Sequence, residues 1–562
     1  MILRKCTALV LSAVLLTGLS ASTLAAEYPD VAPEYWAYSD IQKASEYGLV
    51  QGMDDGTFQP GEKLNRASFV TILQRMFGWE NTPPEAPTFS DVPAGHWAYA
   101  AVEAAQARGI LDPSDEFHPA AYVTRQDMAV LLVRALGYDT LAADLLAAGK
   151  ADSFPDVTDY AGHIAVAAAI GLTNGITDPA TGVTYFQPDS FATRDQAAAM
   201  LSRVYERYIS KVDWLHGFYA FSSFGQISTT AGMEGVSVGW AQMEYDPATG
   251  PWLNSQKTDT NDWVKPTDYQ SATAYFQGNG TPYNLNVYAD TRQLVSLPDG
   301  TKTSTLESIL SSPEAQTQAI AALAAVSADY AGITIDFEGL KSDTYKEAFV
   351  AFMTGLRAAL PDGKTLYVCV PTFDWYKGYD YRALGEVCDK VILMAHDYQW
   401  TSVPDGYVGA RTPDSPVTPL PRVFQALQAI TDPATGVQDK SKIALQISFG
   451  TAGFKIDENG LLTETKIYHP AQETIAKRLA QPDTTITYDW SDRNPCAIYY
   501  GDDGVTRYQL WYEDARSVKD KIDLARMFGI TGISVWRIGN IPSDPEDANL
   551  YYDVWPAFLQ QK

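Results

Sequence analysis

From about residue 213 to the C-terminus, short apolar runs alternate with longer stretches that have apolar residues at helical spacing. The short runs predict strands. Between the fourth and fifth runs, an apolar residue recurs every three to four positions, which predicts an amphipathic helix with Tyr345, Phe349, Phe352, Leu356 and Leu360 on one face. The runs that we expect to be strands span residues 215–221, 235–242, 283–289, 330–338, 366–371, 390–398, 442–450 and 532–539.

Eight strands joined by helical crossovers predict a (β/α)8 TIM barrel of the α/β class over residues 213–562. We expect a small insertion before the last strand, at about residues 455–510. An open doubly wound sheet is the alternative, but the Gly-x-Gly-x-x-Gly turn that would support it does not follow the first strand. In a barrel of this kind, the carboxyl ends of the strands carry the functional site.

The first 210 residues contain one pattern three times. Each copy has an Asp-Val turn, a helical stretch, a Phe-x-Pro segment and a capped second helix that starts near an arginine. A repeat of this length indicates one supersecondary unit used three times. We therefore predict an all-α domain of three small units, residues 27–80, 86–140 and 151–208. The paired landmarks are Asp30 and Arg66, Asp91 and Arg125, and Asp156 and Arg194.

Polar side chains follow the predicted barrel strands. Thr334, Asp336 and Glu338 alternate along the fourth strand, so their side chains face the same way and should point into the barrel mouth. Two carboxylates this close raise each other's pKa, and a protonated acid beside an ionised one is what glycoside cleavage needs. A buried ion pair with a lysine or arginine is the structural alternative. Other strands end in His396, Asp397 and Trp536, the last of which could equally be core packing.

Composition and charge limit the partners and cofactors that the chain can be expected to bind. A formal net charge of -27 argues against nucleic acid or an anionic membrane as the main partner. The six histidines show no ligand-type cluster, and we predict no metal and no cofactor. Residues 1–26 have the layout of a secretory signal peptide, and no later apolar stretch is long enough to predict a membrane span. Three sparse cysteines predict buried free thiols, Cys369, Cys388 and Cys496.

The C-terminal half resembles glycoside hydrolase family 18. "YAGITIDFEG" at 330–339 is similar to the family's strand-four signature Asp-Gly-x-Asp-x-Asp-x-Glu, with matches at Gly332, Asp336 and Glu338. "LMAHDY" resembles the strand-six Met-x-Tyr-Asp, and "GISVWRIG" fits the strand-eight tryptophan. The resemblance covers nearly all of residues 213–560. It is closest to the spore-cortex and cell-wall N-acetylglucosaminidase branch, which is related to the chitinases.

This resemblance implies a TIM barrel that works by substrate-assisted catalysis with retention of configuration. Glu338 would protonate the glycosidic oxygen, while Asp336 would orient the substrate's 2-acetamido group, whose carbonyl oxygen attacks the anomeric carbon. Trp536 would form the floor under the reacting sugar. The resemblance implies further substrate contacts from His396, Asp397, Tyr398 and Thr334.

The sequence departs from the family pattern at three positions. Ala331 and Thr334 stand where the strand-four signature usually has acids, and His396 stands in the place of a tyrosine. An imidazole can also donate a hydrogen bond, but it titrates near neutrality. The departures imply an activity that is slow, shifted to acid pH or absent.

The three N-terminal copies resemble the S-layer homology family, which has the same Asp-Val, Trp-Ala, Phe-x-Pro and Thr-Arg-Ala-Glu landmarks. The resemblance implies a three-unit pseudo-trimer that binds pyruvylated secondary polymer on a Gram-positive-type cell wall. A guanidinium fork suits a ketal carboxylate, so the implied ligands are Arg66, Arg125 and Arg194. Helix-end salt bridges are the alternative role for these arginines.

Three functional hypotheses follow. The first is a secreted, wall-anchored retaining glycosidase that acts on β-1,4-linked N-acetylglucosamine in peptidoglycan or chitin. The second is a lectin-like family 18 barrel that binds such glycans without turnover. The third, a purely structural S-layer protein, accounts for the repeats but not for the polar strand ends. Chitin and peptidoglycan, and endo and exo action, all stay open at this point.

Overall fold

A computed structural model of the protein describes residues 28–562 except 81, 260, 373–376 and 544–549. The predicted signal peptide, residues 1–26, lies outside the described residues. The chain divides into two compact units, one with the residues up to Thr124 together with Ser190–Arg203, the other with Arg125–Asp189 together with Val204–Lys562. None of the described helices has the length and apolar character needed to cross a membrane.

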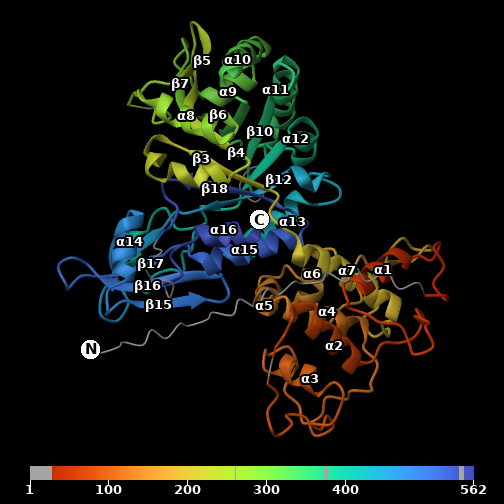
Figure 1. The fold of residues 1–562 in the computed structure, drawn as a ribbon. Coiled ribbons are helices and arrows are strands. Elements are labelled where there is room, and N and C mark those ends of the chain that lie inside the picture. Colours follow the sequence, from red (N-terminus) through yellow and green to blue (C-terminus); the bar gives the residue numbers. More distant parts are fainter. Residues whose placement is uncertain (1–27, 81, 260, 373–376, 544–549) are drawn as a thin grey trace, which may run out of the picture. The chain divides into compact units, whose positions relative to one another are not determined.

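A closed barrel of eight parallel strands forms the core of the second unit (Figure 1). Each strand pairs with its neighbour in the order given below, and the last strand pairs with the first. All eight apolar runs of the sequence are barrel strands, which confirms the predicted TIM barrel. In order around the barrel, they are β3 (Trp214–Tyr219), β4 (Gly235–Asp246), β6 (Tyr283–Asp290), β9 (Gly332–Glu338), β10 (Thr365–Pro371), β11 (Lys390–Met394), β12 (Ile443–Ser448) and β18 (Gly532–Ile538).

Helices form most of the crossovers between barrel strands. Helix α11 (Lys346–Ala359) is the predicted amphipathic helix, and it buries Phe349, Phe352 and Leu356 because these side chains share one face. The other helices of this part are α8 (Tyr269–Asn279), α9 (Thr305–Leu310), α10 (Pro313–Val326), α12 (Tyr381–Val387), α13 (Leu420–Ile430), α15 (Ala515–Met527) and α16 (Trp555–Gln561). Short 3-10 segments are η1 (Phe221–Gly232), η2 (Ser327–Asp329), η3 (Asp343–Tyr345), η4 (Asp405–Tyr407) and η5 (Lys440–Lys442).

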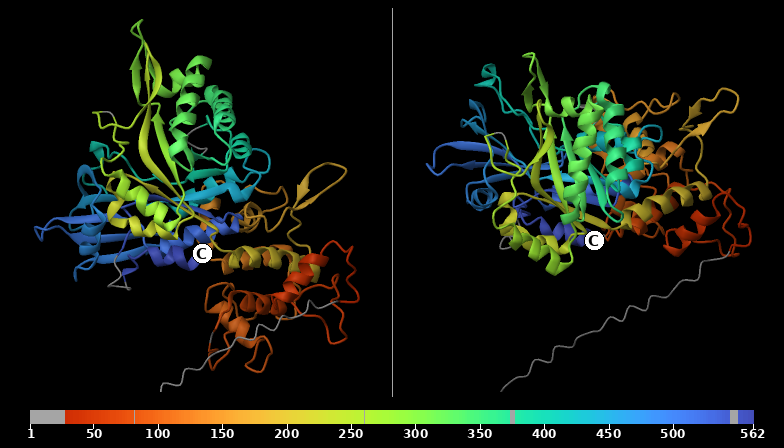
Figure 2. Two further views of the ribbon diagram at one scale, coloured as in Figure 1. Left: turned by 45° about the horizontal axis from the view of Figure 1, so that its top comes forward. Right: turned by 90° about the horizontal axis from the view of Figure 1, so that it is seen from above.

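Antiparallel strands are added to the barrel in three places. The strand β5 (Gly250–Asn254) forms a hairpin with β4 that extends past the barrel (Figure 2). A second small hairpin joins β7 (Leu294–Ser296) to β8 (Lys302–Ser304). The predicted insertion is a five-stranded sheet between β12 and β18 with helix α14 (Gln472–Leu479). Its strands are β13 (Ala452–Ile456), β14 (Leu462–Tyr468), β15 (Thr485–Asp489), β16 (Asn494–Tyr500) and β17 (Arg507–Trp511).

A polar chain fills the barrel interior below the strand ends. The ring nitrogens of His216 lie 2.9 Å from Oγ of Ser534 and 2.8 Å from Oγ of Ser237, and Ser237 lies 2.7 Å from the hydroxyl of Thr334. These four side chains are buried. Burial, with a smaller contribution from Lys390, lowers the pKa of His216 to about 3, so this histidine is neutral and structural.

The N-terminal copies share one local structure. In each copy, the landmark aspartate accepts two backbone N–H bonds from the Phe-x-Pro segment, as Asp30 does from Phe58 and Gln59 at 2.7 and 2.6 Å. Asp91 and Asp156 make the equivalent bonds in their copies. The elements are α1 (Tyr38–Glu46), α2 (Arg66–Phe77), α3 (Tyr99–Gln106), α4 (Arg125–Ala135), α5 (Asp139–Ala147), α6 (Ala161–Ala169), α7 (Arg194–Ile209) and a two-residue hairpin, β1 (Ile176–Thr177) with β2 (Thr184–Tyr185).

The first unit contains a pseudo-threefold contact. Leu64, Val123 and Ala192 each lie two residues before a landmark arginine. The N–H of Leu64 donates to the carbonyl of Ala192, that of Ala192 to Val123, and that of Val123 to Leu64, at 2.9 to 3.0 Å. Three equivalent positions thus satisfy one another's backbone groups in a closed ring, as repeated units that bury little alone are expected to do.

Candidate functional sites

Two carboxylates stand at the carboxyl end of β9. Asp336 is 3% exposed, and Glu338 lines a hollow of about 480 Å³ at the barrel mouth. The amide of Asn286 donates to Oδ2 of Asp336 at 3.4 Å, whereas Oδ1 of Asp336 is buried and has no hydrogen-bond partner among the described residues. The strand alternation therefore places Glu338 at a cavity, with the buried Asp336 two residues before it on the same strand.

The surroundings of this pair favour bound protons. Burial raises the pKa of Glu338, and the negative charges of Asp336 and Asp290 raise it further. Burial also raises the pKa of Asp336, against hydrogen bonds from Asn286 and Cys369. Neither carboxylate pairs with a lysine or arginine in the described part of the chain, so the ion-pair alternative finds no partner there. The pair can hold a proton near neutral pH and share it.

His396 follows β11 and lines the same hollow. Its Nε2 donates to Oε1 of Gln446 at 2.6 Å, and its Nδ1 lies 3.0 Å from Oδ2 of Asp397 without the alignment of a hydrogen bond. Burial disfavours the imidazolium, but Asp397, Gln446 and Glu338 outweigh it, and the pKa of His396 is raised. These neighbours therefore favour the imidazolium form of His396, in the place where the family pattern has a tyrosine.

The structure does not bring every predicted contact into the hollow. Thr334 is completely buried in the barrel interior, where its hydroxyl lies 2.7 Å from that of Ser237. Asp397 lines the hollow, and its backbone has a φ of 62°. The next residue, Tyr398, packs instead under the guanidinium of Arg422, 5.0 Å from its ring centre. Strand β11 ends at Met394, so the strand alternation does not extend to Tyr398, and the left-handed backbone of Asp397 follows outside the strand.

Aromatic rings form a wall near the carboxylates. Trp536 is half-buried and packs edge-on against Phe218 at 5.2 Å. Trp263, from the loop between β5 and α8, lies 6.0 Å from Trp536 and stacks on Tyr288 at 4.6 Å. A Cβ at Gly239 would stand 3.0 Å from the Trp263 ring, so this glycine makes room for it. Apolar sugar faces stack on such rings, and Trp263 joins Trp536 as a candidate contact.

The sequence analysis missed three charged groups at this site. Asp290 ends β6 and is the register partner of Glu338. Arg292 and Lys341 line the hollow from the loops that follow β6 and β9. Asn286 and Tyr288 alternate along the third predicted strand, and Asp290 follows directly after it at the same spacing. Polar groups alternate in the same way along the fourth strand, so this spacing could have identified Asp290. Nothing in the local sequence marks the two cations.

Metal ligands and cysteine thiols are the remaining candidates for site chemistry. Among the described residues, no group of three or more His, Cys, Asp or Glu side chains could hold a metal ion. Burial raises the pKa of each of the described thiols, which makes them poor nucleophiles. The prediction of buried free thiols is confirmed for Cys369, Cys388 and Cys496.

The landmark arginines of the repeats make one kind of contact. Each arginine donates from Nε to the backbone carbonyl of a Phe-x-Pro phenylalanine in another copy, at 2.8 to 3.0 Å. The guanidinium also lies over that phenylalanine ring at 4.7 to 5.2 Å. This geometry fixes each guanidinium against the ring of the phenylalanine. The pairs are Arg66 with Phe117, Arg125 with Phe186, and Arg194 with Phe58.

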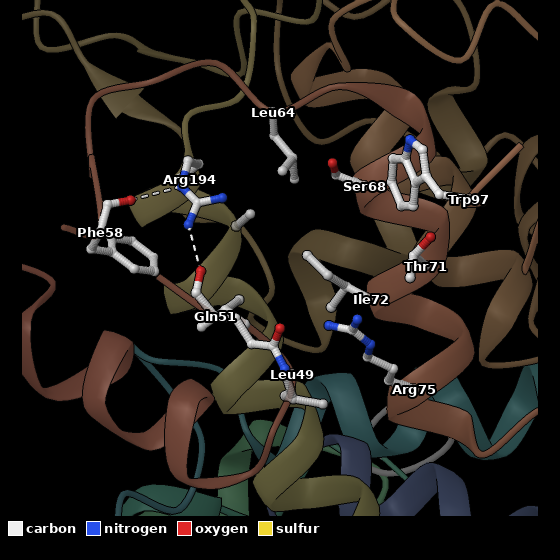
Figure 3. Close-up of a pocket in the computed structure, with 12 residues that line it drawn as sticks. Leu49, Gln51, Phe58, Leu64, Ser68, Thr71, Ile72, Arg75, Trp97 and Arg194 are labelled. Atoms are coloured by element: carbon white, nitrogen blue, oxygen red, sulfur yellow. Dashed lines mark hydrogen bonds between the residues drawn. The ribbon is translucent and has the colours of Figure 1, made fainter. Parts of the chain in front are cut away.

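One of these arginines borders a hollow of about 160 Å³ in the first unit (Figure 3). Two of the guanidinium nitrogens of Arg194 donate to Phe58 and Gln51, and Figure 3 shows the third facing the hollow. Arg75 reaches toward the same space from α2, and the exposed Trp97 stands at its rim. Two guanidinium groups facing one space suit a carboxylate or another small anion.

Comparisons with known proteins bear on both halves of the chain. A family model for the S-layer homology domain matches residues 27–70 and 88–129. The cortical fragment-lytic enzyme of Bacillus anthracis is 28% identical over 215 residues, 37% of this chain and 46% of that protein. The S-layer protein sap of Bacillus anthracis is 30% identical over 140 residues, 24% of this chain and 17% of that protein. The chain thus spans less than half the length of these curated relatives.

The barrel half matches a family over most of its length. A solved structure of a chitinase from Chromobacterium violaceum ATCC 12472 is similar with a TM-score of 0.45 and 21% identity, over 62% of this chain and 98% of that one. The model of the glycosyl hydrolases family 18 matches residues 214–540, more than half of the chain and almost the whole barrel. By this match, the chain belongs to glycosyl hydrolases family 18.

Proposed function

We propose that the barrel hydrolyses β-1,4-linked N-acetylglucosamine glycans by substrate-assisted catalysis with retention of configuration. The observation that carries the proposal is Glu338 at the hollow with Asp336 buried behind it on the same strand, both with pKa values raised by burial. Membership of family 18 supports the reaction class. The names of relatives that act on spore cortex or chitin support the glycan class.

In the proposed reaction, Glu338 donates its proton to the glycosidic oxygen as the bond to the anomeric carbon breaks. The acetamido carbonyl oxygen of the same sugar attacks that carbon, so no enzyme nucleophile is needed. Asp336 accepts a hydrogen bond from the acetamide N–H; its Oδ1 has no hydrogen-bond partner among the described residues. Glu338 then takes a proton from the water that opens the cyclic intermediate, and the acid is restored.

Turnover is tested with a chromogenic N-acetylglucosamine oligomer and with purified peptidoglycan. We expect Glu338→Gln to reduce product release by at least a hundredfold, because general acid catalysis contributes about that much. The exposed Glu347→Gln is the matched control and should leave release unchanged. Equal release from the Glu338→Gln chain and the wild type would refute the assigned acid. Proton NMR of the first product should show the β-anomer.

A lectin-like barrel is the second candidate, and the replacement of the family's tyrosine by His396 favours it. The same experiment separates the two. If the wild type and the Glu338→Gln chain bind the oligomer equally and neither releases product, the lectin-like function is supported and the glycosidase is refuted.

We also propose that the N-terminal repeats hold the protein on the cell wall through a pyruvylated secondary polymer. The hollow bordered by Arg194 and Arg75 supports this, because ketal-linked pyruvate presents a carboxylate. The roles of Arg66 and Arg125 belong to the same proposal. Cosedimentation of the full chain with purified walls should weaken in Arg194→Gln but not in Lys519→Gln. Undiminished binding to walls stripped of pyruvate by mild acid would contradict the proposed ligand.

A further inference from the structure

Two cations line the hollow beside Glu338. Arg292 follows β6, and Lys341 follows β9. The two loops are joined, because the N–H of Thr291 donates to the carbonyl of Glu338 and its hydroxyl donates to the carbonyl of Gly339, both at 3.2 Å. The two cations therefore sit on one wall that is built onto the end of the strand carrying the acid.

The Arg292 side chain is held in place by a buried group. Oδ1 of Asp290 accepts the backbone N–H of Arg292 at 2.5 Å, and Oδ2 accepts its Nε–H at 2.7 Å. The side chain of Asp290 is 5% exposed, whereas that of Arg292 is 80% exposed. The buried carboxylate thus orients an exposed guanidinium, whose planar fork can bind a second carboxylate from solvent.

Lys341 has no opposite charge bonded to it at the hollow. Asp290 pairs with Arg292, and Asp397 lies 3.0 Å from His396. Lys341 is exposed and forms no ion pair with any residue that the structure describes. A chain with a formal charge of -27 therefore places two exposed cations at this hollow, where they can attract an anionic group of a ligand.

A second hollow of about 440 Å³ adjoins the first, and Asp290 and Arg292 line both. A glycan long enough to occupy both hollows passes Arg292. The second hollow also contains Glu244, whose carboxylate accepts a hydrogen bond from Asn254 at 2.6 Å. This negative charge disfavours an acidic group there, so an acidic substituent belongs in the first hollow, between Arg292 and Lys341.

We propose that Arg292 and Lys341 are specificity-determining residues that recognise a carboxylate on a sugar of the bound glycan. The site would then prefer amino-sugar chains with acidic substituents, as in peptidoglycan, where alternate sugars carry a lactyl ether, over neutral chitin chains. The inference rests on the proposed function, which places the scissile bond at Glu338.

The test compares two forms of one glycan. Peptidoglycan strands freed of their peptides present lactyl carboxylates, and chemical reduction of these carboxylates to alcohols gives a neutral chain of the same shape. We measure kcat/KM at pH 6 for wild type, Arg292→Gln, Lys341→Gln and the charge-matched control Lys519→Gln. Wild type and control should prefer the carboxylate form by about tenfold to a hundredfold, as expected for a charge-assisted hydrogen bond. Each of the other variants should lose most of this preference.

A second readout keeps this inference distinct from the proposed function. Binding of the two glycans to the full-length Glu338→Gln chain is measured by calorimetry, alone and combined with Arg292→Gln or Lys341→Gln. The inference is supported if the Glu338→Gln chain prefers the carboxylate form and loses this preference when either cation is substituted. This holds even if the wild type shows no turnover, because absent turnover would refute only the glycosidase. Equal affinity of the Glu338→Gln chain for both forms, or a preference that survives both cation substitutions, would overturn the inference.

Discussion

The acid–base behaviour of Glu338 can be perturbed without changing either of the proposed catalytic carboxylates. Asp290 and Glu338 are register partners on the adjacent strands β6 and β9. The negative charge of Asp290 contributes to the raised pKa of Glu338. Asp290 itself stays ionised, because its bonds to Arg292 and Tyr288 outweigh burial and lower its pKa. The substitution Asp290→Asn should therefore lower the pKa of Glu338.

The size of the effect follows from the strand geometry. Paired strands lie about 5 Å apart, so the two carboxylates are roughly 6 Å apart. At an effective dielectric constant of about 20, this distance corresponds to about 3 kcal/mol, or about two pKa units. Solvent reaches the pair through the exposed Arg292 and screens part of the interaction. We expect a decrease of roughly one unit.

The assay is the pH dependence of kcat/KM, which reports the pKa values of the free enzyme. A general acid is active while protonated, so a lower pKa moves the alkaline limb of the profile to lower pH by the same amount. Arg292→Gln removes a cation instead and should move the limb slightly in the opposite direction. Glu347→Gln changes the net charge equally, at an exposed position in the first turn of α11, and serves as the control. An alkaline limb that is unmoved or raised in Asp290→Asn would refute the reasoning.

Three further predictions concern stability and binding. Lys521 and Glu513 form a buried ion pair at 3.0 Å. In denaturant unfolding, Lys521→Met should therefore lower the free energy of unfolding by about 3 to 5 kcal/mol, and adding Glu513→Gln should recover part of this loss. An unchanged free energy of unfolding would show that the pair is not buried. Trp263→Ala should raise KM about tenfold with little change in kcat, and an unchanged KM would exclude stacking of the sugar on this ring. Backbone N–H bonds hold the pKa of Asp91 below its usual value despite burial, so its stabilisation is present above about pH 4 and lost at lower pH. Asp91→Asn should lower the melting temperature at pH 7 but not at pH 3, and an equal decrease at both would point to packing instead.

The missing acids of the strand-four pattern have a structural counterpart. Thr334 replaces an acid with a hydroxyl that bonds within the barrel interior, and the neutral amide of Asn286 stands behind Asp336. The amide of Asn286 stabilises the ionised form of Asp336 through its hydrogen bond, but burial outweighs this effect and keeps the pKa of Asp336 raised.

Periodicity in the sequence predicted the strands, the α11 helix and the repeats, because each depends on residues close together in the chain. The same alternation placed Asp336 beside Glu338, since side chains two residues apart share a face of a strand. It does not extend to Tyr398, because β11 ends at Met394 and the ring of Tyr398 packs against the guanidinium of Arg422.

Local patterns in the chain predict the barrel, the three-copy domain and the two carboxylates at the end of the fourth strand. Which other groups surround these carboxylates depends on the tertiary structure. Trp263 and Lys341 come from loops whose sequence has no period. Lys341 lines the hollow and Trp263 packs near Trp536, because the barrel closes and brings the ends of distant strands together. The charge that a buried carboxylate carries is likewise set by neighbours from other strands, such as Asp290, and no local pattern contains that information.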